Sequence, residues 1–192
     1  MQIDNSSIKE ICNIAIEAGL IIKKHYKSEI KISLKQDQSP LTEADLQSNK
    51  FILKSLLEID KSIPILSEES LVNWNIRKNW KKYWLVDPLD GTKEFLNQNG
   101  QFTVNIALIE NNEPIFGIIY TPISSELFYA AKNRGSFKII TKQKIKSLSG
   151  SIRIFSNKKK HKDKLKIIGS LSHTNNELNV WLKNNISSYE II

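Results

Sequence analysis

The sequence predicts an α+β fold, and three observations carry this prediction. Two segments near the start, residues 8–26 and 42–57, place apolar residues at helical intervals. Two short apolar runs, each followed by acids, then resemble buried strands. The stretch from residue 102 to residue 140 alternates β-rich segments with Asn, Pro and Gly, a composition typical of strands joined by tight turns.

The first helix is expected to run from about residue 8 to residue 26. Ser7 and Glu10 have the spacing of a capping box, which satisfies backbone N–H groups at a helix start. Ile11, Ala15 and Ile22 follow at helical intervals and predict the buried face of this helix.

A second helix is expected to begin at Thr42. Pro40 disfavours helix at the residue before it, and Thr42 and Asp45 have the spacing of an N-terminal cap. Such a cap would by itself account for Asp45, without any chemistry. The buried stripe of this helix is predicted to consist of Leu46, Ile52, Leu53, Leu56 and Leu57.

The two short apolar runs predict buried strands that end in acids. Residues 63–66 lead into Glu68 and Glu69, and residues 83–86 lead into Asp87. Further strands are expected at residues 102–109 and 115–121, separated by the turn residues 111–114, and at residues 127–130 and 137–140.

A domain junction is expected where the chain becomes polar and small, between residues 141 and 150. This divides the chain into an α+β domain, residues 1–150, and a segment, residues 151–192, with a strand at 152–155 and a helix at 177–184. Such a short segment cannot readily bury a core of its own. We therefore expect it to be the opening of an α/β domain that is left incomplete.

The composition of the chain favours some classes of protein and excludes others. The 192 residues include 28 basic and 20 acidic ones, and the net charge of +8 makes anionic partners attractive. The lysine run at residues 158–162 contains no aromatic residue, and no helix-turn-helix or zinc pattern accompanies it, so nucleic-acid binding is not expected. A single cysteine, Cys12, excludes an intrachain disulfide. Without a signal peptide or a long apolar run, the protein is expected in the cytoplasm.

Two acids flank a stiff segment after the second apolar run. Pro88 fixes its own φ and Gly91 permits close backbone approach, so Asp87, Asp90 and an intervening carbonyl can be aimed at one point. Magnesium prefers oxygen ligands of this kind, and carboxylates held close together need a cation because they repel one another. A metal site is one interpretation. An ordinary β-turn is the other, because Asp, Pro and Gly are the usual turn residues.

Glu68 and Glu69 belong to the same metal site only if the two apolar strands are neighbours in one sheet. At least three acids would then meet at its edge. Taken alone, the pair is better interpreted as two solvated surface acids.

Three motifs together resemble the inositol monophosphatase superfamily in order and spacing. They are residues 38–45, 66–69 and 84–95. The run from Asp87 to Phe95 is similar to the 3′(2′),5′-bisphosphate nucleotidase branch, as are residues 102–109 and 117–122. The resemblance covers nearly the whole chain and implies a layered α-β-α-β-α sandwich that hydrolyses phosphate monoesters.

The resemblance also implies a role for each residue of the motifs. The attacking water would be oriented and partly deprotonated by Thr92 and Asp45, with Glu68 among the catalytic groups. Two or more Mg²⁺ ions would be bound by the carboxylates of Glu68, Asp87 and Asp90 and by the carbonyl of Leu89. The substrate would contact Glu68, Leu89, Asp90, Gly91 and Thr92, with its phosphate against the last two.

The substrate implied by Lys93, Glu94 and Phe95 is 3′-phosphoadenosine 5′-phosphate, a by-product of sulfate assimilation that would be hydrolysed to AMP and phosphate. Inositol 1-phosphate or a related sugar phosphate is the alternative. Relatives include monomers and dimers, so the oligomeric state stays open. Attachment to the surface of the inner membrane is known for this type of enzyme. In this chain, only the positive net charge supports it.

One departure from the family pattern concerns the second domain. The family carries a further metal-binding aspartate there, in a Trp-Asp pair, and no such pair follows residue 150. Asp163 lies between two lysines and resembles a solvated surface residue. The chain is therefore expected to be truncated, and a catalytically inactive fragment is a further alternative.

Overall fold

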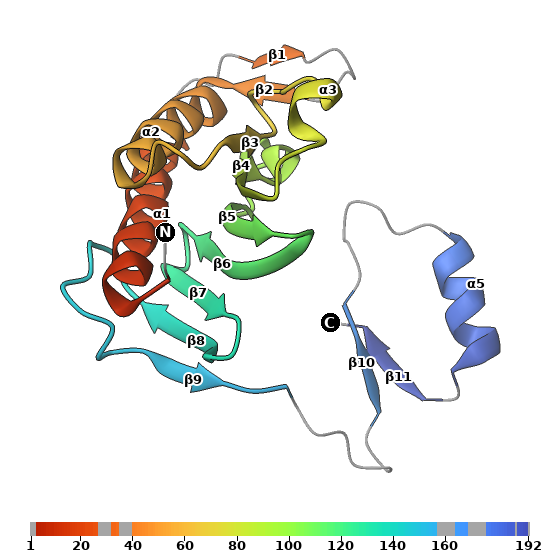
Figure 1. The fold of residues 1–192 in the computed structure, drawn as a ribbon. Coiled ribbons are helices and arrows are strands. Elements are labelled where there is room, and N and C mark those ends of the chain that lie inside the picture. Colours follow the sequence, from red (N-terminus) through yellow and green to blue (C-terminus); the bar gives the residue numbers. More distant parts are fainter. Residues whose placement is uncertain are drawn as a thin grey trace. The chain divides into compact units, whose positions relative to one another are not determined.

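The computed structural model of the chain describes residues 3–26, 32–34, 40–156, 164–168, 176–186 and 188–191. The chain divides into two compact units, Met1–Phe155 and Ser156–Ile192. The first unit contains a seven-stranded sheet and the helices α1 (Asn5–His25), α2 (Glu43–Ile59), α3 (Trp74–Arg77) and α4 (Thr92–Leu96) (Figure 1). The predicted α+β class is confirmed.

Helix α1 begins earlier than its sequence pattern predicts. Asp4 is the capping residue, and its side chain accepts a hydrogen bond of 2.8 Å from the backbone N–H of Ser7. The prediction of a cap at Ser7 was wrong because an aspartate three residues earlier already satisfies that N–H group. The predicted buried face is confirmed, since Ile11, Ala15 and Ile22 are fully buried.

Helix α2 begins after Thr42, where Thr42 and Asp45 form the predicted capping box. Its buried face differs from the predicted stripe, because Leu46 and Leu57 are 43% and 42% exposed. Three polar side chains turn inward instead, next to Ile52. The buried residues of α2 are Ala44, Asp45, Ser48, Asn49, Ile52 and Leu56.

The large sheet has the strand order β3-β4-β5-β6-β7-β8-β9. Strand β3 runs parallel to β4, and every other neighbouring pair is antiparallel. The strands are β3 (Ile65–Ser67), β4 (Lys82–Asp90), β5 (Thr103–Glu110), β6 (Glu113–Thr121), β7 (Glu126–Ala131), β8 (Gly135–Ile140) and β9 (Ile152–Ile154). A smaller antiparallel pair joins β1 (Ile32–Leu34) to β2 (Pro40–Thr42).

Strand β4 is longer than expected. It continues through Asp87 to Asp90, and its register with β5 shifts between these two residues. The acids therefore lie on an irregular strand end and not in a free turn, so the interpretation as an ordinary β-turn was wrong. Irregularities of this kind re-aim side chains at the edges of sheets.

The core lies between the sheet and the two long helices. Helix α1 packs on β5 and β6, and α2 packs on β4, as Figure 1 shows for the helices beside the sheet. The ring of Tyr120 fills the space beside Gly19, where an added Cβ would lie 2.4 Å from it. The other face of the sheet carries an open, mainly apolar hollow of about 780 Å³ that reaches Glu68 and Asp87.

The second unit contains two parallel strands, β10 (Leu165–Ile167) and β11 (Tyr189–Ile191), with helix α5 (Asn176–Asn185) between them in the chain. The strand at residues 152–154, which the sequence assigned to a second domain, is the edge strand β9 of the first sheet. Asp163, the lysine run at residues 158–162 and part of the motif at 38–45 lie outside the described residues. No helix among the described residues is long and apolar enough to cross a membrane.

Candidate active site

The parallel pairing of β3 with β4 brings two acidic segments to one edge of the sheet. Ser67 lies opposite Val86 in the register, and the backbone N–H of Glu68 donates to the carbonyl of Val86 over 3.1 Å. Glu68 therefore follows β3 directly beside Asp87. The condition under which Glu68 joins the acids of β4 is met, because the two strands are neighbours.

Asp87 shows how closely the acids interact. Its burial, the negative charges of Glu68 and Asp90 and a side-chain hydrogen bond that protonated Asp87 donates to Glu68 raise its pKa to about 7. One of its oxygens, Oδ1, is buried without a hydrogen-bond partner among the described residues. A buried carboxylate oxygen that lacks a donor is destabilising unless a cation or a proton compensates it.

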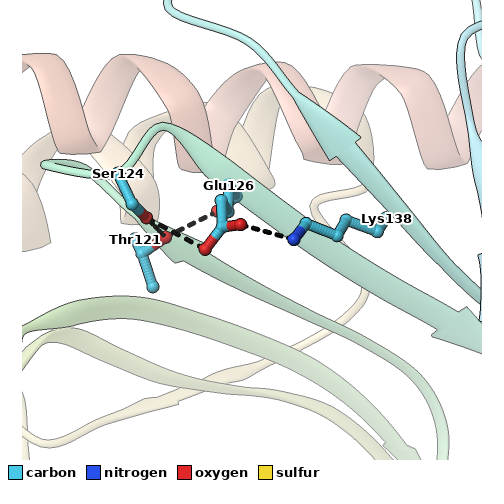
Figure 2. Close-up of polar contacts among 4 residues, drawn as sticks. All are labelled: Thr121, Ser124, Glu126 and Lys138. Atoms are coloured by element: carbon cyan, nitrogen blue, oxygen red, sulfur yellow. Dashed lines mark hydrogen bonds and ion pairs between the residues drawn. The ribbon is translucent and has the colours of Figure 1, made fainter.

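A second acid of the same sheet makes the contrast clear (Figure 2). Glu126 on β7 forms an ion pair with Lys138 and accepts a hydrogen bond of 3.2 Å from Ser124. The hydrogen bond from Lys138 lowers the pKa of Glu126. Thr121 completes this cluster through its 2.5 Å contact with the Ser124 hydroxyl. The charges that act on Asp87 are instead those of two further acids.

The three carboxylates suit a hard divalent cation by their chemistry. All the donors are oxygens, as Mg²⁺ prefers, and the buried Oδ1 of Asp87 is available to an ion. As they are placed, no three acidic, histidine or cysteine side chains among the described residues converge tightly enough to enclose an ion. The residues fit the metal that the sequence motifs imply.

Asp45 acts as a helix cap and also holds Thr92. Its Oδ2 accepts hydrogen bonds from the backbone N–H and the hydroxyl of Thr42, at 2.8 and 2.5 Å. Its Oδ1 accepts a hydrogen bond of 3.2 Å from the Thr92 hydroxyl, which also lies 3.4 Å from the carbonyl of Leu89. The capping interpretation of Asp45 is correct and does not exclude the pairing with Thr92. A hydroxyl held by a buried carboxylate can accept a proton from a water molecule while its own proton moves to that carboxylate.

Helix α2 fixes both acidic segments from one face. Ser48 donates a hydrogen bond of 2.9 Å to the carbonyl of Pro88, next to Leu89 and Asp90. The side-chain oxygen of Asn49 accepts a hydrogen bond of 2.7 Å from the Ser67 hydroxyl. This bond connects the segment before Glu68 to the helix. Neither residue is among the site residues predicted from the sequence. The signal that could have found them is their polarity on a face where the helical period demands apolar side chains.

Gly91 allows the chain to turn from β4 into α4. Its φ is +91°, in the left-handed region, and an added Cβ would lie 2.9 Å from the carbonyl oxygen of Gln101. A residue with a side chain would be strained there and would collide with backbone. Thr92 opens α4 directly after this turn, beside Asp45.

The sequence of this chain is similar to those of known proteins. The chain is 44% identical over 129 residues to "3′(2′),5′-bisphosphate nucleotidase CysQ" of Salmonella typhimurium, covering 66% of this chain and 52% of that protein. It is 50% identical over 125 residues to the protein of the same name in Buchnera aphidicola, covering 64% and 47%. The chain thus spans about half the length of the curated relatives that it matches.

Structural comparison agrees with the sequence comparison. The crystal structure of CysQ from Bacteroides thetaiotaomicron, described as a bacterial member of the inositol monophosphatase family, superposes with a TM-score of 0.80 at 32% identity. The match covers 97% of this chain and 71% of that one. An inositol monophosphatase of Thermotoga maritima shares the fold, with a TM-score of 0.71 at 18% identity. Residues 4–186 match the Inositol monophosphatase family, and the chain belongs to that family.

Proposed function

We propose that the protein is a Mg²⁺-dependent phosphatase that removes the 3′-phosphate of 3′-phosphoadenosine 5′-phosphate to give AMP and phosphate, a reaction linked to sulfate assimilation. The observation that carries the proposal is Asp87, whose buried Oδ1 lacks a hydrogen-bond partner among the described residues, beside Glu68 and Asp90, with the Asp45–Thr92 pair close by. The relatives named as bisphosphate nucleotidases support this choice of substrate.

The family resemblance implies the role of each residue, and the positions of Glu68, Asp87 and Asp90 at one edge of the sheet support these roles. The carboxylates of Glu68, Asp87 and Asp90 and the carbonyl of Leu89 would hold two or more Mg²⁺ ions. Bound there, such ions polarise the phosphoryl group and lower the pKa of a bound water. The substrate would be contacted by Glu68, Leu89, Asp90, Gly91 and Thr92.

Thr92 would orient the attacking water. The Asp45 carboxylate fixes the Thr92 hydroxyl, and its charge favours transfer of a proton from the water towards it. The reaction would be a direct in-line displacement at phosphorus, without a phosphoenzyme. The backbone of Gly91 and Thr92 would face the phosphate. Asp45 needs no movement for this role, because its second oxygen is anchored to the start of α2.

The partner of this site is a small phosphorylated molecule, and we propose that the protein works in the cytoplasm. Attachment to the membrane surface rests on the net charge of +8 alone. The match to the inositol monophosphatase family as a whole favours a second candidate substrate, inositol 1-phosphate. A third candidate, an inactive form, is favoured by the partial match, which covers 52% and 47% of the two curated relatives.

The test is phosphate release by the purified 192-residue chain, in Mg²⁺, from each of the two substrates. We expect faster release from 3′-phosphoadenosine 5′-phosphate and loss of release in Asp90→Asn. Asp60→Asn is the matched control, since Asp60 ends α2 and bonds Ser62 away from the acids. A preference for inositol 1-phosphate would contradict the assigned substrate, and no release from either would support the inactive form.

A further inference from the structure

Strand β5 places two polar side chains opposite the acids of β4. Asn105 lies opposite Asp87 in the register, and Thr103 lies opposite Asp90. Because residues two apart in a strand point to the same face, Thr103 and Asn105 lie on one side of the sheet. The side-chain Nδ2 of Asn105 donates a hydrogen bond of 3.1 Å to Oδ2 of Asp90.

The orientation of the Asn105 amide is fixed by its two partners. The carboxylate of Asp90 can only accept, so the NH₂ group must face it. The amide oxygen, Oδ1, then accepts a hydrogen bond of 3.0 Å from the Thr103 hydroxyl. The result is a chain of hydrogen bonds from Thr103 through Asn105 to Asp90, with every donor directed towards the acid.

Asp90 needs such a partner because its surroundings repel it. Asp87 lies three residues before it at the same strand end, and two carboxylates held close together repel each other when both are ionised. Asp90 is also exposed, and packing alone does not restrict its side chain. A neutral donor on the neighbouring strand can hold the carboxylate in place without competing for a cation.

We propose that Asn105 is a positioning residue that orients Asp90 for binding the divalent cation, with Thr103 fixing the amide. The inference rests on the proposed function, because it assigns Asp90 to the metal site. Groups that bond a metal ligand from outside orient it, and their removal weakens metal affinity about 10- to 100-fold. Asn105→Ala is expected to show a loss of that size.

The experiment measures Mg²⁺ affinity by titration calorimetry on the full 192-residue chain. We expect Asn105→Ala to bind Mg²⁺ about 10- to 100-fold more weakly than the wild type. Thr103→Val keeps the shape of the side chain and removes only the hydroxyl, so it should lose less than Asn105→Ala. If Asn105→Ala folds poorly, Thr103→Val tests the same chain of hydrogen bonds in its place.

Asn13→Ala is the matched control for a merely structural effect. The Asn13 amide bonds the backbone of Ile145 twice, at 3.1 and 2.8 Å, remote from the acids. Its loss should lower the free energy of unfolding and leave Mg²⁺ affinity unchanged. If both asparagine variants lost stability but neither lost affinity, the positioning role of Asn105 would be overturned.

A measurement without metal distinguishes the positioning role of Asn105 from the proposed metal site itself. The side-chain NH₂ resonance of Asn105, assigned by its loss in Asn105→Ala, should shift when Asp90 is changed to Asn. An unmoved resonance would overturn the contact itself. Equal Mg²⁺ affinity of wild type and Asn105→Ala would overturn the inference alone, whereas no Mg²⁺ binding by the wild type would overturn the proposed site with it.

Discussion

Replacing Asp87 by Asn should stabilise the metal-free protein, although it removes a proposed ligand. The pKa of Asp87 rises from 3.8 to about 7, so at alkaline pH the folded chain must hold a charge that burial and two neighbouring acids disfavour. A rise of that size corresponds to about 4 kcal/mol, at 1.36 kcal/mol for each tenfold change in the ionisation constant. Asp87 is only partly buried, and solvent screening reduces the effect, so we expect about 2 kcal/mol.

The dependence on pH has a defined sign. Between pH 4 and 7 the folded protein binds the proton of Asp87 more tightly than the unfolded chain does, so metal-free stability should fall as pH rises through this window. Above pH 7 the destabilisation is complete. Asp87→Asn removes the ionisation and should flatten this part of the stability profile.

Urea unfolding in EDTA, at pH 5 and pH 8, measures both effects. At pH 8 the variant should unfold at higher urea than the wild type, and at pH 5 the difference should shrink. Added Mg²⁺ should stabilise the wild type, because it binds only the folded state, and should have little effect on the variant. Lower stability of metal-free Asp87→Asn at pH 8, or an equal response of both proteins to Mg²⁺, would refute the reasoning.

Three further substitutions test other parts of the site. Thr92→Val should retain Mg²⁺ affinity in calorimetry but reduce turnover by about 10²- to 10⁴-fold, and a turnover close to that of the wild type would exclude the role of Thr92 in orienting water. Ser48→Ala leaves the buried carbonyl of Pro88 without its 2.9 Å donor and should lower the free energy of unfolding by about 1–3 kcal/mol in urea. Gly91→Ala forces a side chain into a positive φ and against the Gln101 carbonyl, so it should lower the melting temperature; an unchanged value would show that the turn adapts.

The parts of the fold that depend on local pattern could be predicted from the sequence. The Thr42–Asp45 cap, the buried face of α1 and the positions of the large sheet's strands along the chain all follow from spacing or period. The acids of β3 and β4 could be named as candidates, since each follows a short apolar run. Whether they meet depended on the pairing of β3 with β4, a long-range contact that no local pattern contains.

The features that the sequence did not predict are those in which a polar residue has a distant partner. On α2, Ser48 and Asn49 turn inward because each bonds another segment, and Leu46 and Leu57 are left facing solvent. The helical period places both polar residues on the inward face, but polar side chains are buried only with a partner, and the sequence does not reveal that distant partner. Asn105 was missed for the same reason, because its partner Asp90 lies on the neighbouring strand.

The central claim is that Glu68, Asp87 and Asp90 form one cation site. Electron paramagnetic resonance of free Mn²⁺, titrated into the 192-residue chain, tests it directly, because bound Mn²⁺ disappears from the free signal. The claim predicts bound Mn²⁺ that Mg²⁺ displaces, loss of this binding in Asp90→Asn, and retention in Asp60→Asn. Equal binding by the wild type and Asp90→Asn would contradict it.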